Sequence, residues 1–182
     1  MKKYMLFIAM LFVAAGNLNA QITKVNIQAS GLTCSMCSNA INKALKSVDY
    51  VDKIVANIKN SSFEISFKPN SNINFDQLKK KVEDAGFFVA KFEIVLSVNV
   101  IALSNDAHVD IYGTMFHFLN VGNKVIDGET TIQLLDKGFV TSKEFKKNSK
   151  YTKMECYQTG IMGNCCTDKN KSSGTRIYHV TI

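Results

Sequence analysis

The stretch IVANIKNSSFEISF, residues 54–67, decides the fold that we expect for the N-terminal half of this chain. Apolar residues recur at every second position from Ile54 and again from Phe63, a period that is typical of β-strands. The polar residues 59–62 between the two runs predict a turn. The stretch therefore predicts a hairpin, and a hairpin here favours an antiparallel sheet over a parallel α/β sheet.

Helical spacing appears on both sides of this hairpin. Apolar residues lie on one helical face over residues 37–48 and again over residues 75–85, where Gly86 predicts the end of the second helix. Alternating stretches at 25–29 and from about 88 supply the outer strands. The order predicts an α+β fold, a ferredoxin-like βαββαβ sandwich with a four-stranded antiparallel sheet and both helices on one face.

The segment GLTCSMC, residues 31–37, joins the first strand to the first helix and concentrates the chemistry. Cys34 and Cys37 have the C-x-x-C spacing, so their thiols can converge on one ion or on each other. The N-terminal end of a helix favours the thiolate form, which is the soft ligand preferred by Cu(I). Two thiolates suit linear Cu(I) or Hg(II) and fall short of a closed tetrahedral zinc site.

Residues 22–92 resemble the heavy-metal-associated domain of copper chaperones, copper-transporting ATPases and periplasmic mercury carriers. The segments 31–37, 40–41 and 83–87 carry the resemblance. It implies that Cys34 and Cys37 hold a metal ion, with Cu(I) expected first and Hg(II), Zn(II) or Cd(II) as alternatives. It also implies a metal-transporting ATPase or another CxxC protein as the delivery partner.

Three further residues near the motif have expected roles. Leu32 stands where the family usually has Met, and we expect it to pack beneath the metal loop. Phe87 falls where the family often has an aromatic residue or Lys, and we expect it to pack behind the cysteines. Met36 is either a third soft ligand or an exposed side chain.

Two other interpretations of the cysteine pair stay open. An exported C-x-x-C pair can exchange disulfides, although thioredoxin-like proteins normally carry a Trp before the first Cys and a cis-Pro opposite the pair. Here Thr33 precedes Cys34, the chain has no Trp, and Pro69 is its only proline. The second interpretation is an inert local disulfide.

Residues 95–182 resemble no family known to us and have the composition of short strands. Strand-like runs occur at 95–103, 109–113, 115–119, 131–135 and 176–182, with one candidate helix near 141–150. We therefore expect a small, mostly antiparallel β domain, either a sandwich or an OB-like barrel. The predicted domains are thus 21–94 and 95–182.

Three cysteines lie in this second half: Cys156, Cys165 and Cys166. In an oxidising compartment Cys156 pairs with Cys165 or Cys166 as a loop clamp, which is the favoured interpretation. The alternatives are a second soft-metal site and free thiols. The three His residues are scattered along the sequence and are not assigned as ligands.

Residues 1–20 have the pattern of a secretory signal peptide, with Lys2 and Lys3 before an apolar run that ends at small residues near Ala20. The alternative is a buried N-terminal core helix. Removal of the signal lowers the net charge from +7 to +5, because Lys2 and Lys3 leave with it. We expect an exported protein, periplasmic or secreted, without a stable membrane anchor.

The composition and motifs limit the function. A hydrophobic content of 46% argues against disorder, and the basic run at 143–153 has no interleaved stacking aromatics of the kind that bind nucleic acid. No motif for catalysis or nucleotide binding stands out. We therefore expect a non-enzymatic metal-binding protein that sequesters Cu(I) or passes it on by thiolate exchange, with a thiol-disulfide oxidoreductase as the alternative.

Overall fold

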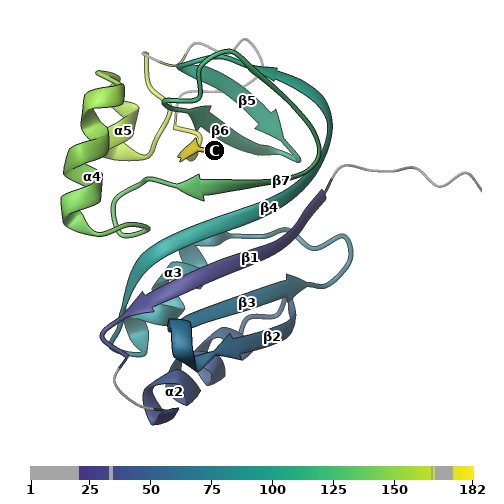
Figure 1. The fold of residues 1–182 in the computed structure, drawn as a ribbon, viewed down its shortest axis with the longest axis vertical. Coiled ribbons are helices and arrows are strands. Elements are labelled where there is room, and N and C mark those ends of the chain that lie inside the picture. Colours follow the sequence, from purple (N-terminus) through teal and green to yellow (C-terminus); the bar gives the residue numbers. More distant parts are fainter. Residues whose placement is uncertain (1–20, 33–34, 165, 167–173) are drawn as a thin grey trace, which may run out of the picture.

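A computed structural model describes residues 21–32, 35–164, 166 and 174–182. Its first half contains β1 (Gln21–Ser30), α2 (Ser35–Lys46), β2 (Val51–Asn57), the short 3-10 helix η2 (Ile58–Asn60), β3 (Ser62–Phe67), α3 (Phe75–Asp84) and the long strand β4 (Phe88–Leu103). The predicted βαββαβ order of this half is confirmed (Figure 1). The predicted signal peptide lies outside the described residues.

The second half adds four strands, two short α-helices and one 3-10 helix to the described part of the chain. They are β5 (Ala107–Ile111), β6 (Thr114–Phe118), β7 (Lys124–Leu134), α4 (Ser142–Asn148), the 3-10 helix η3 (Ser149–Tyr151), α5 (Cys156–Thr159) and β8 (Ile177–Thr181). The expected helix near 141–150 is present and begins with a capping box, in which Thr141 and Glu144 bond each other's backbone N–H groups. None of the helices described is long and apolar enough to cross a membrane.

All eight strands belong to one sheet, in the order β2-β3-β1-β4-β7-β8-β6-β5. Strand β4 pairs with β1 on one side and with β7 on the other, both antiparallel. The boundary predicted between residues 94 and 95 falls inside β4, so the two halves share a strand. The OB-like barrel is not confirmed, because the second-half strands extend this sheet and leave β5 at its far edge.

Local sequence explains where the helices lie and end. In α2 the buried side chains Ser38, Ile41 and Leu45 recur at helical spacing, and they turn one face of the helix toward the sheet. In α3 the Asn74 side chain accepts the N–H of Gln77 at the start of the helix. After α3 the chain reverses at Gly86, whose φ of +88° is a conformation that favours glycine.

One apolar core runs beneath both halves of the sheet. Phe75, fully buried at the start of α3, lies 5.8 Å from Phe92 of β4, 6.4 Å from Phe116 of β6 and 5.2 Å from Tyr178 of β8, measured between ring centroids. Helix α3 therefore packs against strands of both halves.

A polar contact reinforces this junction. Arg176 Nε donates to Asp76 Oδ2 at 2.8 Å, and the Tyr178 hydroxyl donates to the same oxygen at 2.9 Å. Burial alone would raise the pKa of Asp76, but the hydrogen bonds and positive charge of Arg176 leave it lowered. The carboxylate thus stays charged and joins the first turn of α3 to β8.

The shared core predicts that the two halves unfold together. Phe75→Ala should lower the free energy of unfolding by about 3–5 kcal/mol, because it leaves a large cavity at the junction. Hydrogen exchange followed by mass spectrometry should show the same loss in peptides from β3 and from β6.

Met36→Ala is the matched control, since Met36 is 80% exposed and its truncation should change stability by less than about 0.5 kcal/mol. A loss confined to β3 peptides in the Phe75→Ala chain would show that the halves are independent units.

Candidate metal sites

The first candidate site lies where β1 leads into α2. Gly31, with φ of +82°, turns the chain out of β1, and Leu32 is half-buried and packs against the core. Cys37 is half-buried in the first turn of α2. Cys34 lies outside the described residues, so its distance from Cys37 stays undetermined. The structure thus places one thiol of the predicted pair at the helix start.

Three apolar side chains belong to the segments next to this helix start, one on α2 and two where β4 begins. Phe87 is half-buried and packs against the core, while Met36 is 80% exposed and Phe88 is 73% exposed. Phe88 pairs with Ser30 in the β1–β4 ladder, which brings it next to the residues that begin the loop. The cysteine segment therefore has exposed apolar neighbours on the β4 side and on α2.

The second candidate site is a row of three histidines across neighbouring strands. His108 of β5 is paired with His117 of β6, and His117 is paired with His179 of β8. Residues directly opposite each other on paired strands project from the same face of the sheet. Phe116 and Tyr178 alternate with these histidines and face the main core, so the histidine row occupies the opposite face.

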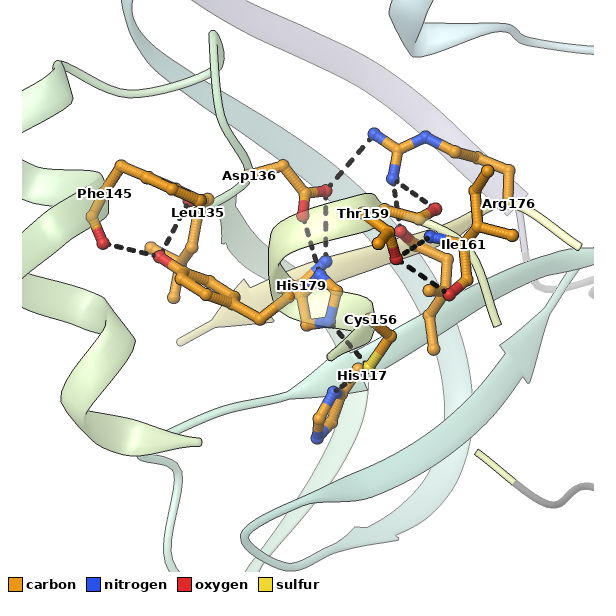
Figure 2. A network of polar contacts seen from close by, with 12 residues as sticks. His117, Leu135, Asp136, Phe145, Cys156, Thr159, Ile161, Arg176 and His179 are labelled. Atoms are coloured by element: carbon orange, nitrogen blue, oxygen red, sulfur yellow. Dashed lines mark hydrogen bonds and ion pairs between the residues drawn. The ribbon is translucent and has the colours of Figure 1, made fainter. Parts of the chain in front are cut away.

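Cys156 brings a thiol to this histidine row. It is the first residue of α5 and is fully buried, as are His117 and His179. Its Sγ lies 3.4 Å from His179 Nε2 and 3.9 Å from His117 Nδ1. Figure 2 shows the sulfur between the two imidazole rings, which come from β6 and β8.

In both His117 and His179, the ring nitrogen that faces away from Cys156 is bound by a carboxylate. His179 Nδ1 lies 2.7 Å from Asp136 Oδ1, and His117 Nε2 lies 3.0 Å from Asp106 Oδ1. Asp136 also accepts the backbone N–H of His179 at 3.2 Å and a bond from Arg176 Nη2 at 3.4 Å. Each ring is thereby fixed with its other nitrogen toward Cys156.

Burial sets the charge state of His117. Removal from water, together with the neighbouring His179 and His108, lowers its pKa to about 4, although Asp106 opposes the shift. The imidazole is therefore neutral at pH 7, the form in which histidine binds metal ions.

The predicted residues of the second half are only partly described. Cys156 and Cys166 are both buried in a cluster with Met115, Met162 and Ile177, and no disulfide joins these two cysteines. Cys165 lies outside the described residues, so a bond from Cys156 to Cys165 stays a prediction. From the sequence alone, no role is predicted for His117, His179 or Asp136.

A signal for these missed residues was present in the sequence. Two of the predicted strands, 115–119 and 176–182, each carry a histidine near the middle. Their pairing side by side, in parallel, depends on a chain reversal through residues 135–175 that periodicity does not reveal. The cluster of His117, His179 and Cys156 therefore depends on the order of the strands in the sheet, which local sequence patterns do not determine.

A sulfur, two or three imidazoles and two carboxylates allow two kinds of chemistry. One ligand atom from each of His108, His117 and Cys156 lies within 4.8 Å of the others, so the cluster can hold a metal ion. Cys156, His179 and Asp136 also form a hydrogen-bonded chain. A thiol nucleophile, its general base and the acid that orients the base are connected in the same way.

Comparison with known proteins supports a role in metal binding for the first half of the chain. Residues 26–88 match the model of the heavy-metal-associated domain. The probable copper-transporting ATPase HMA5 of Arabidopsis thaliana is 31% identical over 80 residues, which cover 44% of this chain and 8% of the ATPase. The chain therefore spans only a small part of that relative's length.

Two smaller proteins match over most of their own length. The copper chaperone CopZ of Staphylococcus aureus (strain bovine RF122 / ET3-1) is 27% identical over 63 residues, which cover 35% of this chain and 91% of CopZ. A solved copper-binding domain from HMA7, a P-type ATPase, is 33% identical and covers 36% of this chain and 88% of that domain, with a TM-score of 0.33. These three matches each cover less than half of this chain.

The buried histidine predicts a pH-dependent stability in the metal-free protein. An unfolded histidine has a pKa of about 6.5, so between about pH 6.5 and pH 4 the unfolded chain binds a proton that folded His117 refuses. The free energy of unfolding should fall by about 3 kcal/mol as the pH falls through this window. Urea titrations at a series of pH values measure the slope.

His117→Gln is the comparison variant, because glutamine keeps a polar side chain and does not titrate. Its stability should fall less steeply over the same window. An identical slope in both chains would assign the effect to other groups.

Proposed function

Because residues 26–88 form a heavy-metal-associated domain, we propose that this chain binds Cu(I) through Cys34 and Cys37 and sequesters it or passes it to a partner. The observation that carries the proposal is the location of the C-x-x-C motif within the matched segment, with Cys37 in the first turn of α2. Copper is the metal chosen because the relatives are copper chaperones and copper-transporting ATPases.

Transfer by ligand exchange requires a partner thiolate to approach the bound ion. Cys37 is only half-buried, and the exposed Met36 and Phe88 provide an apolar rim that can contact a partner protein. A partner with a similar exposed cysteine pair can replace one thiolate at a time. Delivery to a copper-transporting ATPase or another CxxC protein is therefore the proposed direction of transfer.

The proposal predicts the loss of one copper site when both cysteines are replaced. Cys34→Ser combined with Cys37→Ser should lower the Cu(I) bound per chain by one equivalent, because serine oxygens are poor ligands for a soft ion. Titration against a competing Cu(I) chelator, under reducing and oxygen-free conditions, measures the stoichiometry.

Met36→Ala is the matched control from the first turn of α2, next to Cys37, and should leave the stoichiometry unchanged. An unchanged stoichiometry in the double serine variant would contradict the proposal. Insulin reduction that depends on both thiols would instead favour the thiol-disulfide oxidoreductase.

Export is part of the same proposal and is supported by the charged start and apolar run of residues 1–20. Expression of the full chain with its leader in a bacterial host should give a mature protein that begins at Gln21. Intact-mass measurement of the protein from the extracytoplasmic fraction tests this. A product that retains residues 1–20 would contradict export by a cleaved signal.

A further inference from the structure

The Sγ atom of Cys156 lies close to two imidazole nitrogens, which belong to different strands. The sulfur–nitrogen separations are those expected between two atoms that bind the same ion. When an ion has a sulfur ligand at about 2.3 Å and a nitrogen ligand at about 2.0 Å in tetrahedral geometry, those two ligand atoms are about 3.5 Å apart. The observed separations from Sγ are 3.4 Å to His179 Nε2 and 3.9 Å to His117 Nδ1. We propose that Cys156, His117 and His179 form a second copper site, separate from the cysteine pair of the first half.

The carboxylates outside the rings support ligation. A histidine that binds a metal usually donates its other N–H to a carboxylate, which fixes the tautomer and directs the free lone pair at the ion. Asp136 at 2.7 Å and Asp106 at 3.0 Å provide such a partner for His179 and His117, respectively. The two aspartate–histidine pairs thus direct two free imidazole nitrogens at one sulfur. Apolar packing alone does not require this arrangement.

His108 is the alternative third ligand, because one of its ring nitrogens lies within 4.8 Å of the ligand atoms of His117 and Cys156. Its ring stacks on His117, with centroids 4.2 Å apart and planes inclined by 20°. An imidazole nitrogen binds a metal ion through a lone pair that lies in the plane of its ring. In two nearly parallel stacked rings these lone pairs lie in parallel planes, so they do not converge on one ion. The rings of His117 and His179 are inclined by 58°, and each has a nitrogen at the Cys156 sulfur.

The donor set favours copper over harder ions. One thiolate with two imidazoles is the ligand set of copper sites that have a distant Met as the axial group. Met115 and Met162 are buried in the same cluster as Cys156. Asp136 and Asp106 are held by histidine nitrogens, so their carboxylates support the rings and are not aimed at the ion.

An entry route for an ion lies beside the cluster. A surface hollow is lined by Asp106, Thr152, Lys153, Met154, Glu155 and Asn164. Asp106 contacts His117, and Glu155 immediately precedes Cys156. The carboxylates of Asp106 and Glu155 and the Met154 thioether thus place possible metal ligands at the surface next to the cluster. A substrate attacked by that thiol would need direct access, and Cys156 and His179 are fully buried.

The test uses the full chain carrying Cys34→Ser and Cys37→Ser, so that the first site cannot contribute. The reduced, metal-free protein should retain one Cu(I) per chain against a competing chelator. Adding Cys156→Ala or His179→Gln should abolish that retention. His108→Gln and Cys166→Ser are matched controls from the same region and should keep it.

Spectroscopy of the double serine chain provides a second readout, which needs no substitution within the cluster itself. Cu(II) added to the double serine chain should produce an intense visible thiolate-to-copper charge-transfer band and electron paramagnetic resonance couplings from two imidazole nitrogens. Circular dichroism confirms that each variant is folded.

Three results would overturn the proposal. The first is a double serine chain that retains no copper, and the second is retention that survives Cys156→Ala in a folded chain. The third is retention that His108→Gln abolishes and His179→Gln does not, because it would replace the proposed ligand set.

Discussion

Both halves depend on the backbone hydrogen bonds of β4, which pairs with β1 over residues 88–97 on one edge and with β7 over residues 93–103 on the other. In a ferredoxin-like sheet of four strands with this order, β4 would be an edge strand with unpaired N–H and C=O groups. Here the second half of the chain covers that edge. The ferredoxin-like half and the β-rich extension are therefore one folded body.

The same strands build two different environments on the two faces of the sheet. Phe116 and Tyr178 face the core shared with α3, whereas His117 and His179 of the same strands face Cys156 of α5. Asp136 binds both His179 and Arg176, and Arg176 in turn binds Asp76 of α3. The packing that joins the two halves thus also supports the buried thiol–imidazole cluster (Figures 1 and 2).

Local patterns in the sequence predicted the first half well, because hairpin periodicity, helical faces and Gly86 are local signals. The C-x-x-C motif could be recognised because its spacing lies within one turn. The histidine cluster could not, since His117 and His179 meet only through the parallel pairing of β6 with β8. The continuous sheet was missed for a similar reason: the sequence of β4 predicts two separate strands, and only the pairing of β7 with residues 93–103 shows that one strand continues across the predicted boundary.

We propose that one folded chain holds copper in two chemically different sites, an accessible thiolate pair and a buried thiolate–imidazole cluster. X-ray absorption at the copper edge of the native chain, loaded with two equivalents of Cu(I), distinguishes the two kinds of ligand. Two such sites should give sulfur and nitrogen scatterers together, with the multiple scattering of imidazole rings. A sulfur-only shell, or a chain that never takes up the second equivalent, would contradict it.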